Sequence, residues 1–198
     1  MKGTRNLGLY IILGIAVILL FWGCSGYNGL VTADQDVKKV WGNVETNYQR
    51  RTDLYSSVIK TVEASANFEK STLKEVVEAR AKATSVTVDI NDPKSLEQFQ
   101  QAQANLQGSM SRLIASFENY PDLKTTQQFQ GFQAQIEGTE NRINVARQDY
   151  NKSVNDYNLA VKRFPKNILA GLFGYKEKAF YKADPGSEKA PDIKFDIK

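Results

Sequence analysis

Apolar side chains recur along this 198-residue chain at alternating steps of four and three, in three long stretches. This spacing places them on one side of an α-helix, so each stretch predicts a helix with a buried seam. The first predicted helix covers residues 34–85, the second runs from Pro93 to about 117, and the third covers 129–164. Three such seams bury best against one another. We therefore expect an all-α protein, an elongated antiparallel bundle of three long helices and one short helix.

Breaks between the expected helices follow known signals. Residues 86–90 are rich in β-branched side chains, and Asn91, Asp92 and Pro93 then predict a short link and a new helix N-cap with proline in the first turn. Pro165 ends the third helix or starts another, and residues 168–175 form a short apolar turn or helix. Residues 183–198 read as an extended tail, in which Ile193, Phe195 and Ile197 alternate like an edge strand.

The N-terminal segment has a different composition. Lys2 and Arg5 are followed by residues 6–33, which contain no charged side chain. Residues 7–27 are long enough for a helix that crosses a bilayer, which needs about 20 residues. By the positive-inside bias, we expect residues 1–6 in the cytoplasm and the bundle domain, 34–182, on the outer face of the cytoplasmic membrane.

Two alternatives to a spanning helix remain open at this stage. A cleaved signal peptide would need small side chains near the cleavage site, whereas this chain has Phe21 and Trp22 there. Cys24, the only cysteine, sits between Gly23 and Ser25 as the acceptor of a bacterial lipid anchor would. The simplest interpretation of Cys24 is a lone thiol near the membrane surface.

Composition argues against several functions. The chain has no histidine and one cysteine, which excludes an internal disulfide framework and makes a histidine-dependent hydrolase or a zinc site improbable. No glycine-rich phosphate loop is present. We therefore expect no cofactor and no enzymatic activity.

The net charge of +4 is carried by residues 162–198, and the remainder is neutral. Nucleic acid is not an expected partner, because such proteins show a longer basic stripe. A basic, aromatic segment could instead meet anionic lipid headgroups or a protein partner, or it could be ordinary solvated surface. Its cations are Lys162, Arg163, Lys166, Lys176 and Lys178.

Arg51 lies within the first seam, where apolar or aromatic residues are expected. A buried guanidinium must be paired. Charged residues of the third helix are the candidates, and the predicted structural network contains Arg51, Asp53, Glu137, Glu140 and Arg147. In the third helix, Tyr150-Asn151 and Tyr157-Asn158 repeat one heptad apart, which we interpret as core tyrosines with polar hydroxyls.

Several motifs resemble the LemA family of bacterial membrane proteins. They are YNGLV (27–31), QRRTDL (49–54), EAR (78–80), YPDLK (120–124), EGTENRINVARQDYNKSVNDYN (137–158) and FP (164–165). The resemblance implies a membrane anchor and an antiparallel bundle of long helices, but no catalytic residues. This chain departs from the family at Ser56, where the family usually has proline. The absence of proline there favours an unkinked first helix.

Together these features favour a non-enzymatic, membrane-anchored helical scaffold. Its expected partners are membrane lipid through the anchor, further copies of itself as a homo-oligomer, and unidentified envelope proteins. The alternative is a membrane-surface or membrane-remodelling protein that acts through self-assembly and its basic C-terminal segment.

Overall fold

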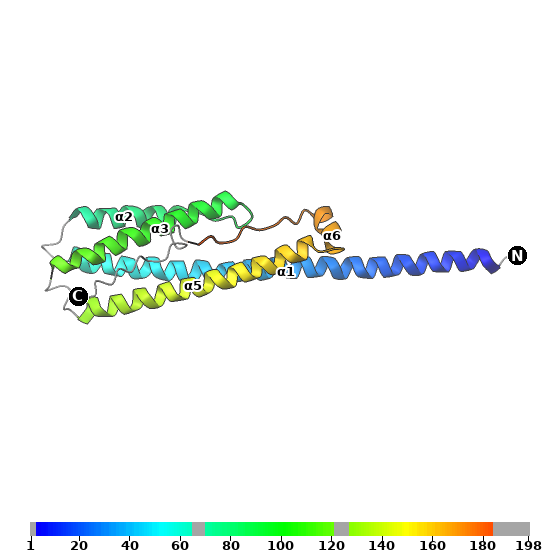
Figure 1. Cartoon of the computed structure of the whole chain (residues 1–198), viewed down its shortest axis with the longest axis horizontal. Coiled ribbons are helices and arrows are strands. Elements are labelled where there is room, and N and C mark those ends of the chain that lie inside the picture. Colours follow the sequence, from blue (N-terminus) through cyan, green and yellow to red (C-terminus); the bar gives the residue numbers. More distant parts are fainter. Residues whose placement is uncertain (1–2, 65–69, 121–126, 184–198) are drawn as a thin grey trace, which may run out of the picture.

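The computed structural model describes residues 3–64, 70–120 and 127–183, and all regular structure in them is helical. The helices are α1 (Gly3–Glu63), α2 (Lys70–Ser85), α3 (Pro93–Ser116), the short 3-10 helix η1 (Phe117–Asn119), α5 (Gln127–Lys162) and α6 (Lys166–Phe173). Helices α1, α2, α3 and α5 run alternately up and down and form the elongated bundle (Figure 1). The predicted fold class is confirmed.

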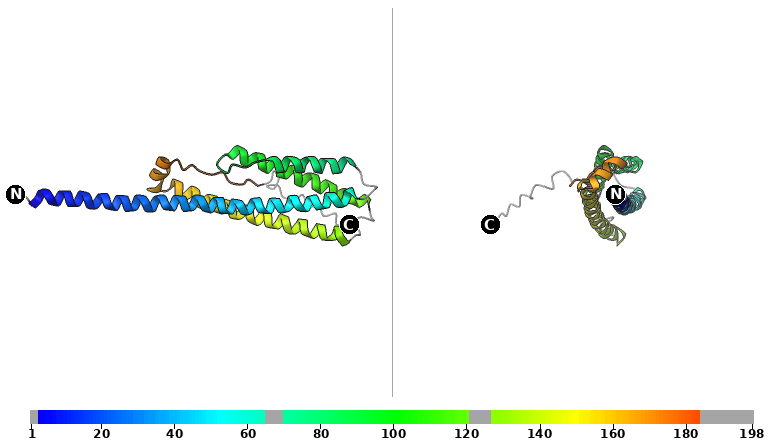
Figure 2. Two further views of the ribbon diagram at one scale, coloured as in Figure 1. Left: turned by 180° about the vertical axis from the view of Figure 1, so that it is seen from behind. Right: turned by 90° about the vertical axis from the view of Figure 1, so that its right-hand side faces the viewer.

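Helix α1 has 61 residues, which corresponds to a length of about 90 Å. Its N-terminal part extends beyond the other helices, whereas its C-terminal part lies in the bundle (Figures 1 and 2). Its large apolar side chains from Leu9 to Phe21 are more than half exposed. Among the described residues α1 is the one helix long and apolar enough to cross a membrane, a property that membrane anchors and signal sequences share.

One predicted helix boundary is wrong, and residues 25–32, which join the apolar segment to the bundle, lie within the continuous helix α1. The helix predicted over 34–85 is two antiparallel helices, α1 and α2. Val58 and Val62 of α1 share one apolar cluster with Val76 and Ala83 of α2, which requires the chain to fold back on itself. Heptad spacing alone does not distinguish a helix that continues from one that reverses.

Gly26 and Gly29 lie within α1 and face α6. A Cβ atom on Gly26 would lie 2.6 Å from Cδ1 of Leu169, and one on Gly29 would lie 3.1 Å from Nζ of Lys166. Gly26 therefore allows close approach of α6 to α1, whereas at Gly29 the neighbouring atom is the flexible end of a lysine side chain.

The seam predictions are mostly confirmed. Every seam residue of α1 from Val37 to Val62 is buried, and Asp92 caps α3 by accepting a hydrogen bond from the Lys94 amide at 3.0 Å. Phe164 is the exception: α5 ends at Lys162, and the Phe164 side chain is 80% exposed. The alternating residues 193–197 lie outside the described residues.

The core has two apolar halves. The half nearer the exposed apolar segment of α1 contains Trp41, Tyr48, Phe99 and Tyr150. The far half contains residues such as Tyr55 and Leu106. Between them, the three longest helices of the bundle contribute polar side chains. These are Arg51 and Thr52 of α1, Gln103 of α3, and Thr139 and Glu140 of α5. The polar layer divides the core into two.

Candidate functional site

The segment after α6, residues 174–183, runs back along the bundle without helical structure (Figure 1), and we call it the strap. Two asparagines of α5 hold it. Asn158 Nδ2 donates to the Lys178 carbonyl oxygen at 3.0 Å, and the Lys178 amide donates to Asn158 Oδ1 at 2.9 Å. Asn151 makes the same pair of bonds with Tyr181, at 2.9 and 2.7 Å. Each side-chain amide thus pairs with both backbone groups of one strap residue, as a neighbouring strand would.

The tyrosine beside each asparagine adds a further hydrogen bond. The Tyr157 hydroxyl donates to the Lys176 carbonyl oxygen at 2.9 Å, and the Tyr150 hydroxyl donates to that of Ala179 at 3.1 Å. Burial raises the pKa of both hydroxyls to about 12, with the Asp34 charge adding to the effect at Tyr157. The hydroxyls are therefore protonated donors at neutral pH. The repeated Tyr-Asn pair holds the strap, which is more than the core role that the sequence suggested.

The spacing of these contacts has a geometric reason. One heptad of α-helix rises about 10.5 Å, and three residues of extended chain cover about 10 Å. Asn158 and Asn151 are seven residues apart on α5, and their partners Lys178 and Tyr181 are three residues apart on the strap. A heptad repeat on the helix is therefore in register with a three-residue repeat on the strap.

Lys178 is buried, which contradicts its predicted place on a basic surface. Its Nζ lies 2.9 Å from Asp34 Oδ1 of α1 and 2.6 Å from Asn91 Oδ1 of the α2–α3 link, and 4.9 Å from the centre of the Tyr157 ring. Burial opposes ionisation of Asp34, but hydrogen bonds from Lys178 and Lys38 outweigh it and lower the pKa of Asp34. One lysine thus ties the strap to two other parts of the bundle.

We expect Lys178→Met to lower the stability of the full chain in detergent by about 1–2 kcal/mol at pH 7, since a charge-assisted hydrogen bond is lost. The pKa of Asp34 is lower in the folded state than in the unfolded state, so the pair stabilises above about pH 4 and its contribution is lost as the pH falls through the folded pKa. Urea unfolding measured at several pH values should show that the free energies of unfolding of variant and wild type become more similar as the pH falls from 7 to 3. Lys182→Met, which removes an exposed pair with Glu97, is the matched control and should change little. If the difference in free energy of unfolding does not vary with pH, the Lys178–Asp34 pair is not the source of the stabilisation.

The polar layer contains two of the five residues of the predicted charge network, Arg51 and Glu140. Arg51 is fully buried, and its Nε donates to Glu140 Oε1 at 2.8 Å while its Nη2 donates to Glu140 Oε2. The Tyr55 hydroxyl donates to the same carboxylate at 3.3 Å. Burial alone would lower the pKa of Arg51, but Glu140 raises it above the ordinary value. Nη1 of Arg51 and Oε1 of Gln103 have no partner in the described part of the chain.

Arg147 connects Tyr48 of α1 to the strap. Its Nε and Nη2 donate to the Tyr48 hydroxyl at 2.9 and 2.7 Å, and its guanidinium lies 4.5 Å from the centre of the Tyr181 ring. The hydroxyls of Tyr48 and Tyr181 are 2.6 Å apart. Either hydroxyl can be the donor in this bond, and the Tyr48 hydroxyl thus links Arg147 to the strap.

Two residues predicted for the network lie outside it. Asp53 is exposed and accepts a hydrogen bond from Gln49 on its own helix at 3.0 Å. Glu137 is exposed, one turn of α5 before Glu140. Charge composition identified the helix but not which carboxylate faces inward.

The remaining predicted surface residues lie near α6. Lys162 pairs with Glu177 at 2.8 Å, Arg163 and Lys176 are exposed, and Lys166 covers Gly29 of α1. Cys24 is exposed on α1 as a free thiol. Its lipidation stays a prediction.

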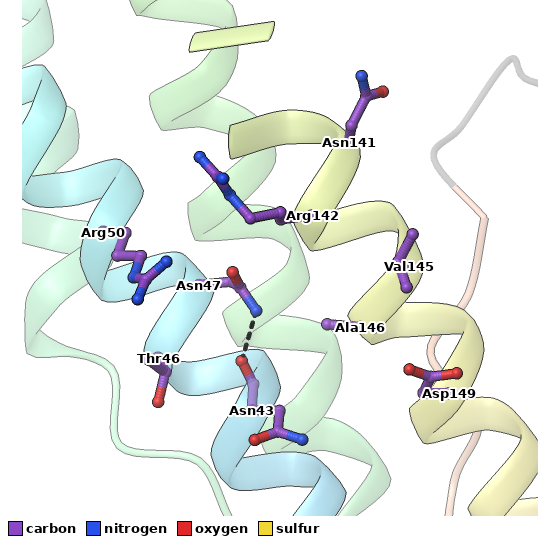
Figure 3. Close-up of a pocket in the computed structure, with 9 residues that line it drawn as sticks. All are labelled: Asn43, Thr46, Asn47, Arg50, Asn141, Arg142, Val145, Ala146 and Asp149. Carbon is purple, nitrogen blue, oxygen red and sulfur yellow. Dashed lines mark hydrogen bonds between the residues drawn. The ribbon is translucent and has the colours of Figure 1, made fainter. Parts of the chain in front are cut away.

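A groove that sequence analysis missed lies between α1 and α5, with a volume of about 430 Å³. Arg142 reaches from α5 toward α1, where Arg50 and Asn47 lie (Figure 3). Val145 and Ala146 provide apolar surface, and a second depression that shares Asn43 and Asp149 continues the groove. Within the described residues no cluster of three or more acidic or cysteine side chains could hold a metal ion.

Comparison with known proteins finds a matching family model and several distant relatives. A sequence model of the LemA family matches residues 40–195. Two MamQ magnetosome proteins of Paramagnetospirillum magneticum are each 23% identical to this chain over 181 residues, covering 82% of it and 66% of the relative. Protein LemA of Metamycoplasma hominis is 22% identical over 175 residues, covering 88% of this chain and 77% of the relative. The chain thus spans just under two thirds of the length of the MamQ relatives.

Proposed function

This chain belongs to the LemA family, and from that premise we propose that it is a non-enzymatic, membrane-anchored scaffold of the bacterial cell envelope. It holds a rigid helical bundle at the outer face of the cytoplasmic membrane, where the bundle binds envelope proteins or further copies of the chain. The observation that carries the proposal is the continuity of α1. The same helix supplies the exposed apolar segment and, from Leu30 onward, buried core residues of the bundle.

Continuity has a mechanical consequence. A flexible linker would let the bundle sample many orientations, whereas an unbroken helix sets its height and direction relative to the bilayer. The strap adds to this rigidity, since it joins α5, α1 and the α2–α3 link through Lys178. A rigid body of this kind suits binding more than a catalytic cycle. The two buried charged side chains among the described residues, Arg51 and Lys178, are each paired with a carboxylate, of Glu140 and Asp34 respectively.

We expect the full-length protein to stay in bacterial membranes after an alkaline carbonate wash, because about 20 apolar residues of α1 would remain in the bilayer. Intact-mass measurement should find the N-terminal segment retained. Loss of the residues before Cys24, with or without a diacyl group on that cysteine, would contradict a spanning helix.

Partner binding can be tested by photo-crosslinking in cells. Val145 is 57% exposed beside the α1–α5 groove, and Val77, which is 41% exposed on α2, is the control. With a photoreactive residue at position 145, we expect defined adducts to the chain itself or to an envelope protein, and fewer adducts from position 77. No adduct from any exposed bundle position would refute the scaffold.

A further inference from the structure

Helix α6 packs against α1 at the end of the bundle nearest the exposed apolar segment. Leu169 lies over Gly26, and the ring of Phe173 lies 4.7 Å from that of Tyr27, measured between centroids. Ala170 of the same helix is buried. Figures 1 and 2 show α6 lying across the long axis of α1 rather than along it.

The outer side of this helix is apolar and exposed. Phe164, Ile168 and Leu172 have exposed fractions of 80%, 59% and 76%. Ile168 and Leu172 are four residues apart and therefore share one side of α6, and Phe164 is exposed in the turn that precedes the helix. We call these three residues the α6 stripe. Large apolar side chains gathered in this way on a protein surface mark a contact.

The stripe begins where the apolar surface of α1 ends. The large exposed apolar residues of α1 continue to Trp22, and Gly26, which touches α6, is four residues later, a rise of about 6 Å. Tyr27 lies at the same level, where aromatic side chains favour the membrane–water interface. If α1 crosses a bilayer, α6 is therefore at the depth of the lipid headgroups.

Positive charge surrounds the stripe. Lys162 and Arg163 precede α6, and Lys176 follows it, all with exposed side chains. Glu177 is the acidic residue next to Lys176, and it pairs with Lys162. Short helices with an apolar side and flanking cations are typical of segments that lie in the plane of an anionic membrane surface.

We propose that α6 lies in the interface of the bilayer that α1 spans, with Phe164, Ile168 and Leu172 inserted among the lipids. This inference rests on the proposed function, because it requires α1 to be a membrane anchor. Its grounds are the continuity of the two apolar surfaces, the crosswise direction of α6 and the flanking cations. The protein then has two attachments to one membrane, and the second prevents rotation of the bundle about α1.

The test uses single spin labels on the full chain, reconstituted in vesicles of phosphatidylcholine and phosphatidylglycerol. Cys24→Ser gives a cysteine-free background, on which Leu172→Cys and Ile168→Cys place labels on the stripe. Val77→Cys is the control, since Val77 is 41% exposed on α2 and does not line the α1–α5 groove. Leu20→Cys reports on the anchor itself. Accessibility is measured to oxygen, which concentrates in lipid, and to a water-soluble nickel complex.

We expect labels at positions 20, 168 and 172 to show a ratio of oxygen to nickel accessibility several-fold higher than that at position 77. A low ratio at positions 168 and 172 with a high ratio at position 20 would overturn the interfacial helix while leaving the anchor intact. A low ratio at position 20 would refute the anchor and with it this inference. Spin–spin broadening at position 172, with low accessibility to both reagents, would identify a second copy of the chain on the stripe and would likewise overturn the proposal.

Discussion

Replacing Glu140 with leucine is expected to destabilise the bundle by about 3–5 kcal/mol, the usual result of leaving one member of a buried ion pair without its partner. Arg51 is fully buried, and Glu140 accepts hydrogen bonds from both Arg51 and Tyr55. The side chain of Glu140 is 22% exposed, so water compensates part of the loss and the effect should fall at the lower end of the range. Urea unfolding of the full chain in detergent measures it.

The double variant Arg51→Met with Glu140→Leu should recover most of this loss, because an apolar pair removes the desolvation cost of both charges. Glu137→Leu is the control on the same helix, since Glu137 is exposed, and it should change the free energy of unfolding by less than about 0.5 kcal/mol. Equal effects of Glu140→Leu and Glu137→Leu would contradict the central role of the buried pair.

The second large effect is expected at Asn158. Asn158→Ala removes two hydrogen bonds to the buried Lys178 and leaves its amide and carbonyl groups unpaired, at a cost of about 2–3 kcal/mol. The loss of stability should be concentrated in the strap, because the Lys178 amide donates its hydrogen bond to the Asn158 side chain that the substitution removes. Hydrogen exchange at the Lys178 amide should become faster by about 30-fold or more, as 2 kcal/mol of local stability corresponds to that ratio.

Asn155→Ala is the matched control, because Asn155 lies on the same helix with an exposed side chain. Exchange in the far half of the core, for example at Leu106, should be affected less than exchange in the strap. If exchange at Lys178 is unchanged in Asn158→Ala, the side-chain amide does not hold the strap. If both regions accelerate equally, the strap and the bundle unfold as one unit.

The amino-acid pattern predicts much of the candidate site, but only at the level of helix faces. Arg51 is identified because it interrupts an otherwise apolar seam, and its partner is predicted to lie on the third helix, where Glu140 does bind it. The predicted network also contains Asp53 and Glu137, which are exposed, because composition does not specify which carboxylate points inward. The repeated Tyr-Asn pairs are visible in the sequence, and only their strap partners, 19–30 residues away along the chain, explain them.

Sequence alone determined the helical class, the buried seams, the N-cap at Asp92 and the apolar segment of α1, because periodicity, capping and hydropathy are local properties. Tertiary structure decided what depends on distant partners. It placed the reversal between α1 and α2, buried Lys178 against Asp34 and Asn91, and left Phe164 exposed. The physical reason is that burial of a charge, or exposure of an apolar ring, depends on which segment packs against it. Residues 87 positions apart, such as Asn91 and Lys178, meet only in the folded bundle.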